Sequence, residues 1–413
     1  MANMRSALFI VLLISFQLTA IGQLQNRIVD PKIKSVYLSQ LVPHELIQAQ
    51  PSFDISAQGN YLLLDDLSLQ NRNSLYLRVI HCQSDWTASP LSDIEFLQDF
   101  NDIPVRDSQA SMGTKVPYRH YQIALPRVKL AGNYVVMLYN RAKRDTILTQ
   151  RYCVYSQELT VATQVRFGRS NALRNTHQNL DIKLKYPSGL MLNAAEDLKI
   201  YVKQNEIIQN QLPKMPTGII NPMEQSISFP TYENEQAIAG GNEYRLVDLR
   251  STQQKLSFID HWDVRENETQ LFTLIETPQG NYAYVQRNDN NGAYVIENYE
   301  NSSNPLFADY VTCTFRLKAP KQTEPIYICG AFNQFQKTAE NEMHYNESAG
   351  IYETSIQLKQ GIYNYRFETK NPSNYLEGNY AQTENSYEIF VYLRKPGKRY
   401  DELIGYQKVS SIN

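Results

Sequence analysis

The sequence is poor in several residues and patterns that mark common classes of protein. Of its 413 residues only four are cysteines, six are histidines and two are tryptophans. Four cysteines in so long a chain do not form a disulfide scaffold, and no C-x-x-C pair offers a zinc or redox site. The 40 basic and 42 acidic residues nearly cancel, and no long run of one sign would follow a nucleic-acid backbone. We therefore expect no nucleic-acid partner, no bound metal and no cofactor.

Catalytic patterns are missing as well. The chain has no G-x-S-x-G elbow, Walker loop or G-x-G-x-x-G after a strand, so nucleophilic or nucleotide chemistry has no starting point. His81 with Asp85, and the stretch DHWD at 260–263, could each offer two metal ligands, but hydrogen-bonded interior or half-buried histidines explain both. The adjacent Asp65–Asp66 pair would point to opposite faces of a strand, which does not suit acid and base catalysis. We predict no catalytic, cofactor-binding or metal-binding residues, and a protein that is not an enzyme.

The longest apolar run lies at the N-terminus. Arg5 precedes the apolar stretch 7–18, and Ala20-Ile21-Gly22 places small residues where a signal peptidase reads, so we predict a cleavable signal peptide at 1–22. An uncleaved anchor is the alternative, but the run is short for a span, and no later run approaches the roughly 20 apolar residues that a membrane helix needs. We expect an exported protein that is soluble after cleavage.

Tyrosine and short alternating segments are abundant. The chain has 29 tyrosines, and stretches such as SLYLRVIHC, GNYVVMLYN and RYCVYSQEL alternate apolar with polar residues between Asn, Gly and Pro clusters. The sequence predicts an all-β protein of immunoglobulin-like or early-set β-sandwiches. Length suggests two or three units, and strand spacing divides the chain into three consecutive domains at 23–156, 157–304 and 305–413.

Two local patterns lead to more specific predictions. Ser92 and Glu95 form a capping-box pattern that predicts a short helix, with Ile94, Phe96 and Leu97 as its apolar side. The cysteines at 313 and 329 lie symmetrically in two strands that a hairpin would join. A disulfide between them and a set of buried free thiols both fit this placement.

The segment from IYICGAFNQF to GIYETSIQLKQGIYNYRFE resembles the early-set sandwich of glycogen-binding modules. Those modules stack sugar rings on tryptophans, and here Phe335 and Tyr352 occupy the corresponding positions. Phenylalanine and tyrosine present less flat area than an indole. The resemblance therefore implies a retained fold with a vestigial sugar site, in which Phe332, Tyr363 and Tyr365 serve packing.

Several runs in a fixed order point to a second family. VIHCQSDWTASPLSDIEFLQDF, VPYRHYQIALP and LAGNYVVMLYN resemble the first domain of the plug proteins of the type IX secretion system of Bacteroidetes, and AGGNEYRLVDLR, CGAFNQF and the run EGNYAQTENSYEIFVYLRKPGKRYDELIG resemble the remainder. The resemblance covers about residues 33 to 406. Asp99 departs from it, because a glycine is expected before Phe100. The motif positions, which we take as structural, are His81, Cys82, Asp85, Trp86, Tyr118, His120, Tyr121, Gly132, Asn133, Tyr134, Gly330, Phe332 and Asn333.

This resemblance implies a non-enzymatic, soluble periplasmic protein. Such plugs dock on the periplasmic mouth of the outer-membrane translocon barrel and close it when the cargo-presenting partner is absent, without inserting into the membrane. A long loop within a compact domain is more often functional than idle, so we predict that the loop at 98–120 meets the barrel. Its candidate contact residues are Phe100, Pro104, Arg106, Tyr118 and Arg119. A periplasmic or surface glycan-binding protein is the alternative function.

Overall fold

The computed structural model describes residues 22–41, 45–57, 59–70, 72, 74–143, 145–188, 190, 198–208, 218–231, 237–301, 304–371 and 373–411. The predicted signal peptide lies outside the described residues, except for Gly22. Nearly all regular structure is β, and the described helices are short: α1 (Asp93–Phe96), α2 (Asn374–Glu377), and the 3-10 turns η2 (Pro305–Phe307) and η3 (Ala331–Asn333). The all-β sandwich prediction is confirmed. None of the described helices has the length and apolar character to cross a membrane.

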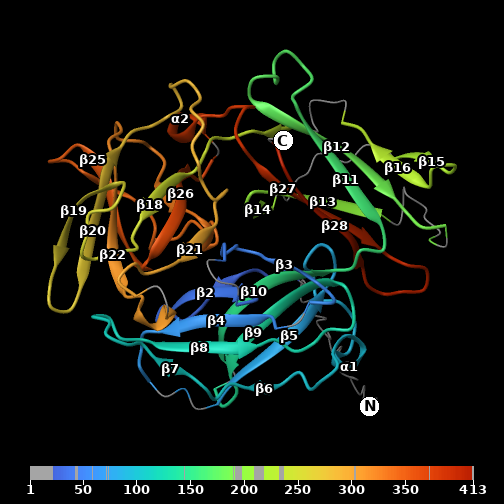
Figure 1. Ribbon diagram of the computed structural model, residues 1–413, viewed down its shortest axis with the longest axis horizontal. Helices are drawn as coiled ribbons and strands as arrows, with labels where there is room; N and C mark the ends of the chain where they lie inside the picture. The colour runs from blue at the N-terminus through green and yellow to red at the C-terminus, as the bar shows by residue number, and fades with distance from the viewer. Residues whose placement is uncertain are drawn as a thin grey trace, which may run out of the picture.

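The strands form three units, each with two facing sheets (Figure 1). In the N-terminal unit, one sheet runs β1-β10-β9-β5-β6 with β3 beside β10, and the other runs β2-β4-β8-β7. Its strands are β1 (Arg27–Ile28), β2 (Ile33–Ser39), β3 (Ser52–Asp54), β4 (Tyr61–Asp66), β5 (Leu75–Cys82), β6 (Ile103–Pro104), β7 (Gln109–Ala110), β8 (Arg119–Ala124), β9 (Gly132–Asn140) and β10 (Asp145–Tyr155). Alternation places Leu75, Leu77 and Val79 of β5 in the core between the sheets.

The second unit is discontinuous in sequence. One of its sheets runs β11-β12-β16-β15 with β17 beside β12, and the other runs β14-β13-β27-β28. Its strands are β11 (Thr160–Phe167), β12 (His177–Lys185), β13 (Leu198–Gln204), β14 (Ile207–Ile208), β15 (Ile219–Asn221), β16 (Ser226–Phe229), β17 (Ile238–Ala239), β27 (Ser386–Leu393) and β28 (Glu402–Ser410). We call it the discontinuous unit, because β27 and β28 come from the C-terminal end of the chain, where β27 pairs with β13 and β28 pairs with β27.

The third unit is inserted between β17 and β27. One sheet runs β18-β26-β21 with β23 beside β26, and the other runs β19-β20-β22-β25-β24. The strands of this inserted unit are β18 (Arg245–Asp248), β19 (Ile259–Val264), β20 (Thr269–Glu276), β21 (Tyr294–Ile296), β22 (Tyr310–Leu317), β23 (Ile326–Cys329), β24 (His344–Asn346), β25 (Ile351–Lys359) and β26 (Gly361–Thr369). Figure 1 shows it on the left, the discontinuous unit at the upper right and the N-terminal unit below.

The strand pairing contradicts the predicted division at residues 304 and 305. Strands β18 to β21, expected in the middle domain, pair with strands of the inserted unit, whereas β27 and β28, expected in the last domain, complete the discontinuous unit. Alternation along a strand reports which face is buried, not which distant strand lies beside it, so an insertion leaves no mark in the local pattern. The predicted boundary near 157 does fall between β10 and β11.

The two connections to the inserted unit run side by side. The Tyr380 N–H donates to the Gly241 carbonyl at 2.7 Å, and the Gly241 N–H donates to the Asn379 side chain at 2.8 Å. A Cβ atom on Gly240 would lie 2.0 Å from the Tyr380 carbonyl oxygen, so this close approach requires glycine.

All four cysteines are buried free thiols. Cys313 lies on β22, which pairs with β20 and β25, whereas Cys329 lies on β23, which pairs with β26 in the opposite sheet. The two strands are therefore not a hairpin pair. Of the two interpretations that the sequence left open, the buried thiols are confirmed.

Candidate functional site

Many of the sequence-predicted motif residues lie where two units meet. The junction of the N-terminal and discontinuous units has its own apolar core, separate from the cores of the units. Its buried members are Cys82, Trp86, Val135 and Cys153 from the N-terminal unit, and Phe390, Tyr392 and Leu403 from the discontinuous unit. A buried apolar interface of this kind opposes relative motion of the two units.

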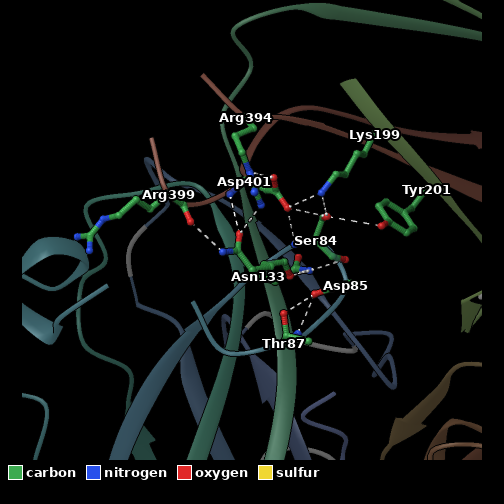
Figure 2. Close-up of polar contacts among 10 residues, drawn as sticks. Ser84, Asp85, Thr87, Asn133, Lys199, Tyr201, Arg394, Arg399 and Asp401 are labelled. Carbon is green, nitrogen blue, oxygen red and sulfur yellow. Dashed lines mark hydrogen bonds and ion pairs between the residues drawn. The ribbon is translucent and has the colours of Figure 1, made fainter. Parts of the chain in front are cut away.

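Asp401 is the polar centre of this junction (Figure 2). Its buried carboxylate accepts from the Ser84 hydroxyl at 2.8 Å, from Lys199 Nζ at 3.1 Å and from Arg394 Nε at 2.9 Å. Burial raises the pKa of Asp401, but the hydrogen bonds from Arg394, Ser84 and Lys199 outweigh this effect, and the pKa lies below its usual value. The aspartate is thus held ionised between two units.

Gln83 forms hydrogen bonds to the connection between β27 and β28, which carries Asp401. Its side-chain oxygen accepts from the Asp401 N–H at 3.0 Å and from Arg394 at 3.2 Å, and its amide donates to the Arg399 carbonyl at 2.9 Å. The Arg399 guanidinium in turn reaches Glu95 of α1 at 3.0 Å. The two motifs HCQSDW and LRKPGKRYDELIG, more than 300 residues apart at Gln83 and Asp401, therefore form one contact surface.

His81 and the motif GNY at 132–134 support this junction from within the N-terminal unit. The His81 Nδ1 atom lies 2.9 Å from the Ser89 hydroxyl, and its ring meets Tyr134 edge to face at 5.1 Å. A Cβ atom on Gly132 would lie 2.7 Å from His81 Nε2, so the glycine makes room for the imidazole. Burial lowers the pKa of His81 to about 4, and the ring is neutral.

Asn133 links the backbone of the HCQSDW loop to the discontinuous unit. Its side-chain amide donates to the Gln83 carbonyl at 3.1 Å and to the Ser84 carbonyl at 3.3 Å, and its oxygen accepts from the Tyr392 hydroxyl at 2.7 Å. The Asp85 carboxylate is exposed and accepts from Thr87 within its own turn. His81 is therefore the buried, hydrogen-bonded histidine that the sequence favoured. Within the described ranges, no cluster of three His, Cys, Asp or Glu side chains could hold a metal.

A second set of buried charges at this junction was not anticipated from the sequence. Lys203 and Glu388 form a fully buried ion pair at 2.8 Å, and Lys203 Nζ also donates to the Gln50 carbonyl at 2.9 Å. Glu206 accepts from the Ala49 N–H at 2.9 Å. Burial raises the pKa of Glu206 to about 7, with the Glu388 carboxylate adding to the shift and Lys203 opposing it.

A different buried cluster joins the N-terminal and inserted units. The Asp65 carboxylate meets His120 Nδ1 and Lys359 Nζ, each at 2.7 Å, and accepts from the Tyr310 hydroxyl at 2.8 Å. Burial raises the pKa of Asp65, but Lys359 and His120 outweigh it, so the pKa lies below its usual value. Asp66 points away, as predicted, and pairs with Arg72.

The second half of the predicted docking loop packs against the inserted unit at this junction. The Tyr118 hydroxyl donates to the Ala308 carbonyl at 3.0 Å, the Lys115 N–H donates to Asp309 at 2.8 Å, and the Met112 N–H donates to the Leu306 carbonyl at 3.0 Å. Tyr118 is almost completely buried. The prediction that Tyr118 contacts an external partner is therefore wrong, because the inserted unit already covers it.

The other candidate residues fall in three environments. Tyr121 is part of the N-terminal core, and Arg119 is half-buried on β8. Phe100, Pro104 and Arg106 are exposed. Of the candidate contact residues, those in the first part of the loop are thus open to a partner.

The turn GAFNQF also faces a junction. Asn333 accepts from the Gly330 N–H at 3.0 Å and donates to the Ile328 carbonyl at 2.7 Å, while Phe332 packs edge to face on Tyr363 at 5.6 Å. The next residue, Gln334, is left-handed with φ of 57° and donates to Gln150 of the N-terminal unit at 2.6 Å. The turn therefore forms part of the interface between the inserted and N-terminal units.

Both vestigial sugar positions are packed. Phe335 is half-buried and meets the Tyr244 ring edge to face at 6.3 Å. Tyr352 is 5% exposed, and its hydroxyl accepts from the Gln322 N–H at 2.6 Å. Neither ring offers the open flat face on which a sugar would stack.

Sequence reasoning found the motif residues but not their charged partners. Lys203, Glu388 and Lys359 are charged residues on alternating strands, where a charge ordinarily marks the solvent face. A weak signal existed for Lys203 and Glu388, since each follows an apolar residue that is also buried, Val202 and Tyr387. Only the position of the neighbouring unit explains their burial.

The fold and these junctions define a protein of three β-sandwich units held together by buried polar and apolar contacts. Residues 33–156, which form most of the N-terminal unit, match the family model described as type 9 secretion system plug protein 1st domain. The chain is also similar to the crystal structure of a hypothetical protein from Parabacteroides merdae. The TM-score is 0.81 and the identity 25%, over 94% of this chain and 100% of that one. The two therefore share the arrangement of all three units. No curated protein matches the chain.

Proposed function

We propose that this protein is a periplasmic plug of the type IX secretion system. In this proposal it docks on the periplasmic opening of the outer-membrane translocon and closes it sterically while the cargo-presenting partner is absent. The match of residues 33–156 to the plug first-domain model carries the proposal. The role is non-enzymatic, because obstruction requires area and shape rather than a reacting group.

The junctions support a blocking role. A plug must keep its shape while it covers an opening wider than one sandwich. Asp401 joins the N-terminal and discontinuous units through Ser84, as Lys203 does through the Gln50 carbonyl, and the Asp65 cluster joins the N-terminal and inserted units. A buried ion pair contributes little net stability, yet breaking one is costly, so such contacts favour a single arrangement of the units.

A surface hollow of about 550 Å³ beside β11 does not suggest a reaction. It is lined by Arg166, Arg169 and Arg174 beside Phe167, with no paired nucleophile and base. Arg166 and Arg169 both pair with Asp181. The glycan-binding alternative gains no support either, because Phe335 and Tyr352 are occupied by packing.

The decisive experiment is a pull-down from the producing organism. The chain, tagged at its C-terminus and expressed from its own locus, is recovered from detergent-solubilised envelopes, and co-purifying proteins are identified by mass spectrometry. A large outer-membrane barrel at near-stoichiometric yield is the expected result. Recovery of glycan-processing enzymes alone, or of no partner, would overturn the proposal.

Closure is tested separately from docking. Deletion of this protein together with the cargo-presenting partner should raise entry of large dyes and antibiotics above the level in either single deletion. Equal entry in the double and single deletions would refute steric closure while leaving docking intact.

A further inference from the structure

Two apolar side chains are unusually exposed on the N-terminal unit. Phe100 is 93% exposed and Ile94 is 81% exposed, the highest values for large apolar side chains among the described residues of this unit. Both lie within 93–102, the segment that contains α1 and the start of the predicted docking loop. Ile94 was expected to face the core with Phe96 and Leu97, but only the latter two do. Large apolar side chains with such high exposure are features of interaction sites.

The backbone that displays Phe100 is firmly anchored. The buried Asn101 side chain accepts from the Val79 N–H and donates to the Val79 carbonyl, both at 2.7 Å, as a neighbouring strand would. On the other side of Phe100, the Gln98 N–H donates to the Arg127 carbonyl at 3.2 Å, and Leu97 is buried. Binding of a partner to Phe100 would therefore cost little conformational entropy, because this segment is already ordered.

Charge on the segment is neutralised except at one position. Three acidic side chains are paired within the protein: Asp93 with Arg78 at 3.4 Å, Glu95 with Arg399 at 3.0 Å and Asp102 with Arg141 at 3.4 Å. The exposed Asp99, next to Phe100, has no such partner among the described residues. A complementary surface would be an apolar pocket with a basic residue at its rim.

We propose that Phe100 and Ile94 anchor this protein in an apolar pocket on the periplasmic side of its protein partner, with a basic residue of that partner facing Asp99. This inference rests on the proposed function and names the docking surface for it. A bilayer is the less suitable occupant. Two apolar side chains bury little area, and the unpaired charge beside them is negative, which anionic headgroups repel.

The test compares full-length variants by the same envelope pull-down and by titration against the solubilised barrel. Phe100→Ala should weaken binding about 30-fold, as expected of a central aromatic anchor, and Ile94→Ala should weaken it less. Asp99→Lys should slow association and reverse its salt dependence. Phe167→Ala is the matched control, because Phe167 is 54% exposed on β11 of the discontinuous unit. It should bind like the wild type.

The outcomes separate this inference from the function on which it rests. If the wild type retains no barrel, the proposed function fails. If the wild type binds and Phe100→Ala binds equally well, the plug function stands and this docking surface is refuted. Sedimentation with vesicles of phosphatidylethanolamine and phosphatidylglycerol tests whether a bilayer is the occupant instead. If the wild type binds these vesicles and Phe100→Ala does not, the proposal of a protein partner for this surface is overturned. Unchanged thermal unfolding of Phe100→Ala establishes that the variant is folded.

Discussion

Asp65 of the N-terminal unit and Lys359 of the inserted unit are 294 residues apart, yet their charged atoms lie 2.7 Å from each other in a site closed to solvent. Neither residue was predicted as a site residue from the sequence. Their contact exists only because the N-terminal and inserted units pack against each other, and it makes the arrangement of these units testable by substitution.

Removing one partner of this ion pair should destabilise the protein strongly. Lys359→Met leaves the Asp65 carboxylate buried with only His120 and Tyr310, and we expect a loss of about 3 to 5 kcal/mol in the free energy of unfolding, measured with denaturant. Lys183→Ala breaks the exposed pair with Glu224 and should cost less than about 1 kcal/mol. Similar losses in the two variants would show that Asp65 and Lys359 are solvated in solution.

Asp401→Asn should loosen the junction of the N-terminal and discontinuous units. The substitution keeps the shape of the side chain but weakens its bonds to Ser84, Lys199 and Arg394, and we expect a loss of about 1 to 3 kcal/mol. Amide hydrogen exchange should rise first at Ser84, whose N–H donates to Asp401 at 3.2 Å.

Asp85→Asn serves as the control for this change. The Asp85 carboxylate is exposed and bonds only within its own turn, which asparagine can also form, so stability should change by less than about 0.5 kcal/mol. Faster exchange at Ser84 in both variants would contradict a specific role for Asp401.

Glu206 should make stability depend on pH. Its pKa rises from 4.5 to about 7 on folding, so between these values the folded state holds a proton that the unfolded state has lost. The free energy of unfolding from this group therefore falls as pH rises from about 4.5 to above 7. Glu206→Gln removes this loss, and its stability relative to the wild type should grow by on the order of 3 kcal/mol between pH 4.5 and pH 8.

The measurement is denaturant unfolding of both proteins across that pH range. In the Glu206→Gln variant the side-chain carbonyl oxygen can keep the Ala49 bond, and the Gln48 amide can rotate to accept from the new amide group. A difference between the two proteins that does not vary with pH would show that Glu206 is already ionised at its usual pKa.

Gly132→Ala should strain the His81 site. The added methyl group would lie 2.7 Å from His81 Nε2, too close for any contact, so either the ring or β9 must shift, at a cost of about 1 to 3 kcal/mol. Introducing His81→Ala into the same chain removes the clash, so the double variant should be more stable than the sum of the single losses predicts. If the losses of the two single variants simply add in the double variant, the methyl group of Gly132→Ala does not clash with His81.

Local sequence patterns predicted individual strands and the short helix, but they did not predict how the strands group into units. Alternation in β5 and the capping box at Ser92, whose N–H donates to Glu95 at 2.7 Å, could be predicted because each depends on residues a few positions apart. Ile94 was misplaced because the helix α1 is a single turn, too short for periodicity to define a face.

For the candidate docking residues, too, the sequence predicted some features and could not predict others. Phe100 was predicted as a docking residue because it lies in a long loop, and the structure leaves its side chain exposed. Tyr118 lies in the same loop and could not be distinguished from it, since its burial depends on η2, nearly 190 residues away.

The sequence by itself determined that the chain is all β, that its cores are built from alternating strands, and that its motifs resemble those of plug proteins, because each of these depends on residue type and short spacing. Only the tertiary structure decided that the third unit is inserted into the second, and that Asp65, Lys203 and Asp401 lie between units. Pairing of strands and burial of charge arise from contacts between distant segments, and those contacts form only when the units pack.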